Sequence, residues 1–178
     1  DEVLWLTGRL PTSALVVGSN IHSHRLTTCT EDFDDALLLL DFGDEDGKGL
    51  IAEVEVSRNH VSGYRSETVL YGETGQIHVG RFNANPREVI VEAYGLRGAA
   101  DPIAMRTFTT RQYNEPLPEF VDRFGAAYKE ELRVFIECCR HEAPFPATHR
   151  DALRAQEVVS AAMTRVLNKS DMATILYR

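Results

Sequence analysis

The sequence predicts an α+β fold: a mostly antiparallel, open-faced sheet of about seven strands with helices packed on one face. Short apolar or alternating segments follow one another first, and two long segments with helical periodicity come after them. Because no helix-length segment separates the strands, they are expected to pair as antiparallel neighbours rather than in parallel with crossover helices. The 178 residues are expected to form a single domain.

The strands are expected in the part of the chain that precedes the two long helical patterns. Ala36–Phe42 is a continuous apolar run, which is typical of a strand buried on both faces. Asp and Gly are frequent in Gly43–Gly49, which predicts a hairpin turn. Leu50–Ser57 alternates, so one face is expected to be apolar and the other to carry Glu53 and Glu55. In chain order the expected strands cover residues 14–21, 36–42, 50–57, 68–71, 76–79, 89–94 and 104–109, with a last one at 174–177.

Three helices are expected. The first covers residues 1–8, with Gly8 as its stop signal. Thr148, with Asp151 three residues later, resembles an N-terminal cap and marks the start of the last helix. The two long helices each carry one apolar stripe at three- and four-residue spacing. The first stripe holds Phe120, Phe124, Tyr128, Leu132, Phe135 and Cys139, and the second holds Ala152, Ala155, Val159, Ala162, Met163 and Val166.

Composition excludes several classes of protein. A net charge of -8 and a pI near 5.2 argue against nucleic acid or an anionic membrane as partner, because both favour a basic face. No apolar run approaches the roughly 18 residues that a membrane span requires. Three cysteines, of which Cys138 and Cys139 are adjacent, favour a reduced, cytoplasmic protein over a disulfide-bonded one.

Three motifs stand in order along the chain. The first is Asp1-x-x-x-Trp5-Leu6-x-Gly8. The second is Ser57-Arg58-x-x-x-x-Gly63-Tyr64-x-x-Glu67-x-x-x-x-Gly72-x-x-Gly75. The third joins Phe120, Arg123, Phe124, Ala127, Tyr128, Glu131, Leu132 and Phe135 to a Pro144-x-Pro146 loop and then Asp151-Ala152. This ordered combination resembles the C-terminal domain of the Gfo/Idh/MocA oxidoreductases, the family of inositol and glucose–fructose dehydrogenases.

The resemblance implies the substrate-binding and oligomerisation domain of an NAD(P)-dependent dehydrogenase that acts on a polyol or sugar such as an inositol. In that family the cofactor is held by an N-terminal Rossmann domain, and the catalytic Lys and His precede the segment that resembles Asp1–Gly8. No residue here is therefore assigned a catalytic or cofactor-binding role. Because the sequence lacks a glycine-rich strand–turn–helix, the chain alone is expected to bind neither NAD nor NADP and to be inactive. With no Met before Asp1, it is expected to be a fragment or a processed product.

The same resemblance points to substrate contacts. Gly63-Tyr64 is similar to the Y-G-Y-D stretch of inositol dehydrogenases, whose second aromatic approaches the sugar, so Tyr64 is the leading candidate. Arg65 replaces the acidic residue of that stretch and Ser62 its first Tyr, which leaves open an acidic sugar or no polyol recognition at all. Arg58 and Asn59 are expected at the strand end that faces the Tyr64 turn, lining the same cleft.

Two residues of the first long helix complete the candidate substrate contacts. Arg123 lies off the apolar stripe, which fits an ion-pair partner or a substrate clamp. Tyr128 lies on the stripe, which favours packing with its hydroxyl at the edge over direct substrate contact.

No metal site is expected. His22 and His24 would share a strand face, but the sequence offers no third ligand near them. His141 follows Cys138 and Cys139 at a helix end, where a His complements the helix dipole. The two acidic groups, Asp32-Asp34-Asp35 and Asp44-Glu45-Asp46, lack the spacing of a calcium loop and are interpreted as solvated turns.

The open sheet face is expected to be a subunit interface. In the family, this face commonly packs against the same face of a second subunit, which implies a homo-oligomer. The residues expected there are Ile51, Glu53 and Glu55 on one strand and Ile90, Glu92 and Tyr94 on another. A competing hypothesis is a stand-alone dimerisation or small-ligand-binding module without catalytic activity.

Overall fold

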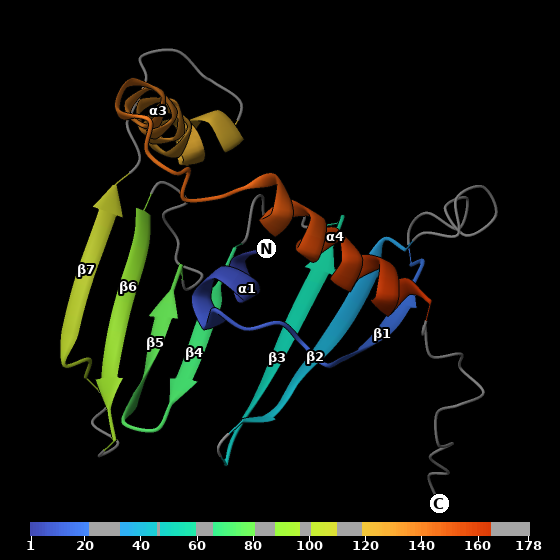
Figure 1. The fold of residues 1–178 in the computed structure, drawn as a ribbon. Helices are drawn as coiled ribbons and strands as arrows, with labels where there is room; N and C mark the ends of the chain where they lie inside the picture. Colours follow the sequence, from blue (N-terminus) through green and yellow to red (C-terminus); the bar gives the residue numbers. More distant parts are fainter. Residues whose placement is uncertain are drawn as a thin grey trace, which may run out of the picture. The chain divides into compact units, whose positions relative to one another are not determined.

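The computed structural model describes residues 1–21, 33–45, 47–59, 66–80, 88–96, 101–109 and 119–164. The chain divides into two compact units: unit 1 comprises Asp1–Asn59 and Pro146–Arg178, and unit 2 comprises His60–Phe145. Each unit is described by itself. In chain order the elements are α1 (Glu2–Thr7), β1 (Ser13–Ser19), β2 (Asp35–Glu45), β3 (Lys48–Ser57), β4 (Thr68–Gly72), β5 (Gly75–Val79), β6 (Glu88–Gly95), β7 (Ala104–Thr109), α3 (Glu119–His141) and α4 (His149–Met163) (Figure 1).

The sheet of unit 1 has three antiparallel strands in the order β1-β2-β3. Its register places Val16, Leu38 and Val54 in one row across the sheet. Successive residues of a strand point to opposite faces, so Leu40, two residues from Leu38, lies on the same face as this row. Val16, Leu40 and Phe42 are only 3–4% exposed, and they form most of the apolar core of the described residues.

Helix α4 lies over this sheet and packs against β1 (Figure 1). It begins at a reciprocal cap: the Asp151 backbone N–H donates to Thr148 Oγ1 at 3.4 Å, and the Thr148 backbone N–H donates to Asp151 Oδ2 at 2.8 Å. Both bonds satisfy N–H groups that the helix itself leaves without acceptors. Ala162, near the other end of the helix, is 1% exposed, and its small side chain permits close packing.

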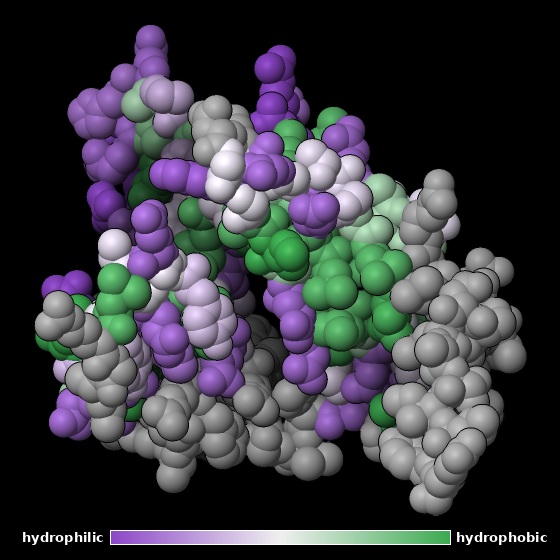
Figure 2. All heavy atoms as spheres, turned by 90° about the horizontal axis from the view of Figure 1, so that it is seen from below, coloured by the Kyte–Doolittle hydropathy of each residue, from purple (hydrophilic) through white to green (hydrophobic). Residues whose placement is uncertain are grey.

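The opposite face of the three-stranded sheet is less covered. Leu15, Leu39 and Glu53 form one row on it, and Leu39 is 36% exposed. Ile51 is 73% exposed. Figure 2, the view from below, looks at the strands from their ends rather than at this face, and shows a group of hydrophobic side chains (green) bordered by hydrophilic ones (purple). This sheet thus has one face against α4 and one face with exposed apolar residues.

The segment between α1 and β1 is attached to the β2–β3 hairpin. Gly8 ends α1 in the left-handed conformation at φ 65°, and its N–H donates to the Leu4 carbonyl at 2.9 Å. The Arg9 guanidinium then donates to the carbonyl oxygens of Phe42 at 3.0 Å and Lys48 at 3.2 Å. One charged side chain therefore links the N-terminal segment to both strands of the hairpin.

Unit 2 contains a four-stranded antiparallel sheet in the order β4-β5-β6-β7. The tight link between β4 and β5 pairs Gly72 with Gly75. One face is largely apolar, with Ile77 opposite Leu70 and Ala93. The other face is more polar, because His78 stands between Val69 and Glu92 in the next row.

Helix α3 displays an apolar stripe, as its sequence predicts, but the stripe is exposed in the described part of the chain. Tyr128 is 48% exposed, Leu132 63% and Phe135 54%. The Phe135 ring stacks on that of Phe145, which follows the helix, with centroids 5.4 Å apart. None of the helices formed by the described residues is long and apolar enough to span a membrane.

The fold class predicted from the sequence is confirmed: in the described ranges, seven strands, all paired antiparallel, combine with three helices. Most predicted strand and helix bounds agree with the structure to within a few residues, and the Gly8 stop and the Thr148–Asp151 cap are both observed. The described strands form two sheets, one of three strands and one of four, instead of the single sheet that was expected. No pairing between β3 and β4 is described. The expected strand at 174–177 lies outside the described residues.

Candidate functional site

Polar side chains gather at one end of the three-stranded sheet. β1 ends at Ser19, β2 begins at Asp35 and β3 ends at Ser57, and the register places these three residues in one row. The residues just beyond this row are polar as well. We call this end of the sheet the polar end and define it by Asn20, Asp34, Asp35, Ser57, Arg58 and Asn59.

Asp34 is the structural centre of the polar end. It is 2% exposed, the lowest exposure of any polar residue described. Its Oδ1 accepts from the Ile21 backbone N–H at 2.8 Å, and its own N–H donates to Asn20 Oδ1 at 3.0 Å. Its carbonyl oxygen accepts from the Arg58 N–H at 2.8 Å. One buried residue at the start of β2 therefore joins the ends of all three strands, because two of these bonds reach the end of β1 and the third reaches the end of β3.

Asp35 and Asn59 lie beside it with polar atoms turned inward. Asp35 Oδ2 and Asn59 Nδ2 are both buried, and neither has a hydrogen-bond partner among the described residues. The Asn59 backbone is held by its N–H, which donates to Ser57 Oγ at 3.1 Å. The carboxylate oxygen accepts hydrogen bonds only, and the amide nitrogen donates only. The polar end thus contains one buried acceptor, Asp35 Oδ2, and one buried donor, Asn59 Nδ2, that form no hydrogen bond with the described residues.

The structure corrects one interpretation of the acidic residues. The group Asp32-Asp34-Asp35 was expected to be a solvated turn, but Asp34 is almost fully buried and Asp35 is the first residue of β2. The reason is the antiparallel return of the chain, which brings Asn20 and Arg58 against this segment. Sequence spacing did not reveal it, since these partners are far away in the chain.

The structure describes some of the substrate-binding residues predicted from the sequence but not all of them. Arg58, which is exposed, and Asn59 belong to the polar end, as expected for the end of β3. Tyr64 and Arg65 lie outside the described residues. Tyr128 lies on α3 in unit 2 and is 48% exposed. Arg123 is also on α3, and its side chain is outside the described part of the structure. The structure therefore brings together two of the six candidates.

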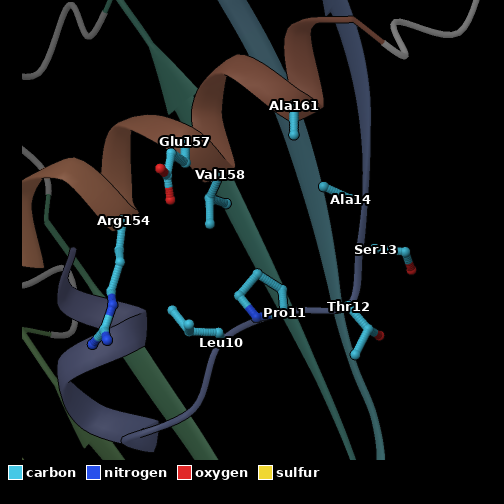
Figure 3. A pocket seen from close by; sticks show the side chains of 9 residues that line it. All are labelled: Leu10, Pro11, Thr12, Ser13, Ala14, Arg154, Glu157, Val158 and Ala161. Carbon is cyan, nitrogen blue, oxygen red and sulfur yellow. The ribbon is translucent and has the colours of Figure 1, made fainter.

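A groove of about 240 Å³ lies between α4 and the start of β1. Figure 3 shows Arg154 and Val158 pointing from the helix toward Leu10 and Pro11. The Arg154 guanidinium lies 3.9 Å from the Asp151 carboxylate, one turn earlier on the helix. Ligand sites usually combine an apolar pocket with converging polar groups. This groove lacks such convergence among its described lining residues, so we interpret it as the packing seam of α4.

A second polar cluster lies on the four-stranded sheet of unit 2, and the sequence analysis did not identify it. The Gln76 amide nitrogen and His78 Nε2 lie within hydrogen-bond distance, at 2.6 Å. The His78 and Tyr94 rings are 5.5 Å apart, and Glu92 stands opposite His78. The signal in the sequence was the alternation of the strands, which places Gln76 and His78 on one face of β5 and Glu92 and Tyr94 on one face of β6.

No group of three metal-ligating side chains occurs among the described residues. His22 and His24 lie outside them. His141 ends α3, and its Nε2 lies 3.2 Å from Glu137 Oε2, one turn earlier. Cys138 Sγ donates to the Pro144 carbonyl at 3.6 Å.

Two carboxyl groups at exposed helix positions have lowered pKa values. Hydrogen bonds from Arg133 lower the pKa of the Glu130 carboxyl on α3, and the ion pair between them is 2.6 Å long. Hydrogen bonds from Thr148, first from its hydroxyl and then from its backbone N–H, lower the pKa of Asp151. Exposed pairs of this kind contribute little to folding stability, because water and salt screen them.

Comparison with known proteins agrees with the motifs. Residues 1–173 match the model of the Gfo/Idh/MocA oxidoreductase family, C-terminal alpha/beta domain. No curated protein matches the chain. The family match covers nearly all of the 178 residues, and the observed α+β architecture accords with it. The chain therefore belongs to the Gfo/Idh/MocA oxidoreductase family, as its C-terminal domain.

Proposed function

We propose that this chain is the substrate-binding and oligomerisation domain of an NAD(P)-dependent oxidoreductase that acts on a polyol or sugar such as an inositol. The family supports an oxidoreductase. The polar end is the observation that carries the assignment of substrate binding to this chain. It joins Arg58 and Asn59, both expected from the sequence to contact substrate, to a buried acceptor on Asp35.

The chemistry of the polar end suits a hydroxylated ligand. A hydroxyl group donates one hydrogen bond and accepts others, so it pairs with a carboxylate oxygen and with an amide N–H at once. Asp35 Oδ2 and Asn59 Nδ2 supply those two groups. Tyr64 follows Asn59 by five positions in the sequence, and we propose that its phenol contributes a further contact.

The cofactor is proposed to be NAD or NADP, held by an N-terminal Rossmann domain of the full-length protein. A dinucleotide pyrophosphate is bound where a strand of a parallel sheet turns tightly into a helix N-terminus. The described strands are all paired antiparallel and do not provide that arrangement. We therefore assign cofactor binding to no residue of this chain, and expect the isolated chain to be inactive.

The oligomer is proposed to form through the open sheet face. In the three-stranded sheet this face carries exposed Leu39 and Ile51, bordered by Glu53 and Glu55. Interfaces commonly combine such an apolar centre with a polar rim. A symmetric dimer would pair this patch with its own copy. Ile51→Lys is expected to shift the protein toward monomer in analytical ultracentrifugation, whereas Lys48→Ala at the hairpin is the control.

The experiment that tests the function is a turnover assay of the full-length protein. Myo-inositol, D-glucose and D-glucuronate are each offered with NAD or NADP, and nicotinamide reduction is followed by absorbance. Oxidation of at least one compound is expected, with a lower kcat/KM for Asn59→Ala and no change for Asp44→Asn, at an exposed position of β2. Binding of a polyol without any oxidation would favour the competing ligand-binding module, and neither binding nor oxidation would refute the proposal.

A further inference from the structure

Two buried polar atoms of unit 1 stand out because the described protein leaves them unbonded. Asp35 Oδ2 and Asn59 Nδ2 have no hydrogen-bond partner among the described residues. More than nine in ten buried polar groups of native proteins are hydrogen-bonded, so each exception requires an explanation. Leaving such a group without a partner destabilises the folded state, most of all when the group is charged.

The two atoms belong to neighbouring positions. Asp35 is directly opposite Ser57 in the β2–β3 ladder, and Asn59 is two residues beyond Ser57. The Arg58 N–H, next to Asn59, donates to the carbonyl of Asp34, next to Asp35, at 2.8 Å. The backbone on both sides of the pair is therefore fixed, and the two side chains start from the same end of the sheet.

Asp34 shows that this end of the sheet supplies a backbone N–H donor to a buried carboxylate. Its Oδ1 accepts the Ile21 N–H, and the residue is 2% exposed. Asp35, the next residue, has an atom that is buried without such a donor. The difference indicates that Asp35 is not there to hold the strand ends together, since Asp34 already does so.

We infer that Asp35 and Asn59 form an acceptor–donor pair that binds the hydroxyl groups of a neutral polyhydroxylated substrate. This inference rests on the proposed function and names two residues that set its substrate specificity. The Asp35 carboxylate accepts from a substrate hydroxyl, and the Asn59 amide donates to the same or the adjacent hydroxyl. A substrate carboxylate near Asp35 would be repelled, because like charges at short range are unfavourable. The pair therefore selects neutral polyols over acidic sugars, the alternative that Arg65 left open.

The binding test uses full-length Asp35→Ala and Asn59→Ala, with Asp44→Asn as the control for an exposed carboxylate at the other end of β2. The probes are myo-inositol and D-glucuronate, and binding is measured by calorimetry. Asp35→Ala and Asn59→Ala are each expected to weaken myo-inositol binding about tenfold, the effect of one lost hydrogen bond. Wild type is expected to bind myo-inositol more tightly than D-glucuronate.

A second readout separates ligand binding from a structural role. Asp35→Asn removes the negative charge of a carboxylate whose Oδ2 is buried without a hydrogen-bond partner in the ligand-free protein, so its Tm without ligand is expected to rise by about 2–4 °C. A lower Tm would mean that Asp35 holds the fold together, and this would overturn the inference. Unchanged myo-inositol affinity in both alanine variants would also overturn it while leaving the proposed function intact. If wild type binds neither probe, the proposed polyol or sugar function itself fails.

Discussion

Asn20 and Asp34 are joined by a hydrogen bond of 3.0 Å from the Asp34 backbone N–H to Asn20 Oδ1, across the end of the β1–β2 pair. Asp34 returns a bond of its own, since its Oδ1 accepts from the Ile21 N–H at 2.8 Å. Asn20 Oδ1, just after β1, and Asp34 Oδ1, just before β2, are thus both acceptors, and together they join these two segments, which closes this end of the sheet. This closure holds the backbone next to Asp35 and Arg58 in place.

Asp34→Ala is therefore expected to destabilise the protein. It leaves the part-buried Ile21 N–H without its acceptor, and the loss of such a hydrogen bond costs about 1 kcal/mol of unfolding free energy. Urea unfolding of full-length protein measures this directly. Asp34→Asn retains an oxygen acceptor and should lose less, while Asp44→Ala, at an exposed position of β2, should change little. An Asp34→Ala protein as stable as wild type would show that the closure contributes nothing.

The start of α4 is expected to depend on pH through Asp151. Hydrogen bonds from Thr148 lower the pKa of the Asp151 carboxyl below its ordinary value of 3.8. The charged form is thus favoured in the folded state, and its stabilising effect is present above pH 3.8 and is lost as the pH falls through the lowered folded pKa. Near neutral pH the free energy of unfolding of wild type should exceed that of Asp151→Asn, and this difference should shrink as the pH falls below 3.8.

A direct titration of Asp151 by NMR checks the cause of this shift. In Thr148→Ala the hydroxyl donor is gone, so the pKa of Asp151 should move back toward 3.8. The same substitution removes the N-cap side chain and is expected to cost about 1 kcal/mol of stability. A pKa that is the same in both proteins would contradict the assigned cap.

Gly75 begins β5 at a point where no side chain fits. A Cβ there would collide with the carbonyl oxygen of Tyr94 on the paired strand β6. Gly75→Ala is expected to lower the unfolding free energy by about 1–3 kcal/mol through this overpacking. Gly49→Ala is the matched control, because a Cβ at Gly49 would meet nothing within 4 Å. Equal stabilities of the two variants would show that β5 and β6 do not approach each other this closely.

If the proposed polyol oxidation is observed, Tyr64→Phe is expected to lower kcat/KM of the full-length protein about tenfold, for one lost hydrogen bond. The substitution retains the ring, so folding stability should not change. Kinetics that are unchanged across inositols and hexoses would assign Tyr64 a packing role.

Local signals in the sequence predicted the fold well. The Thr148–Asp151 spacing predicted the start of α4, and Gly8 predicted the end of α1, because both depend on neighbouring residues only. The apolar run at 36–42 predicted β2, although the strand extends three residues further, to Glu45. Alternation predicted β3 in the same way.

The candidate site was predicted only in part, because its partners are distant in sequence. Arg58 and Asn59 were identified from a motif at the end of a strand. Asp34 was interpreted as part of a turn, since its burial depends on Asn20, fourteen positions away, and therefore on the register of β1 against β2. Asp35 was missed for the same reason: the sequence does not specify which strand end lies opposite it.

The most direct test of the central claim, that the polar end binds substrate, is an amide chemical-shift map of isotope-labelled full-length protein titrated with myo-inositol. The account predicts that the largest shifts fall at 20–21, 34–35 and 57–59, where β1 and β3 end and β2 begins. Residues 10–14 and 154–161, which line the groove beside α4, serve as the internal comparison. Shifts confined to that groove, or no shift at the polar end at saturating ligand, would contradict the claim.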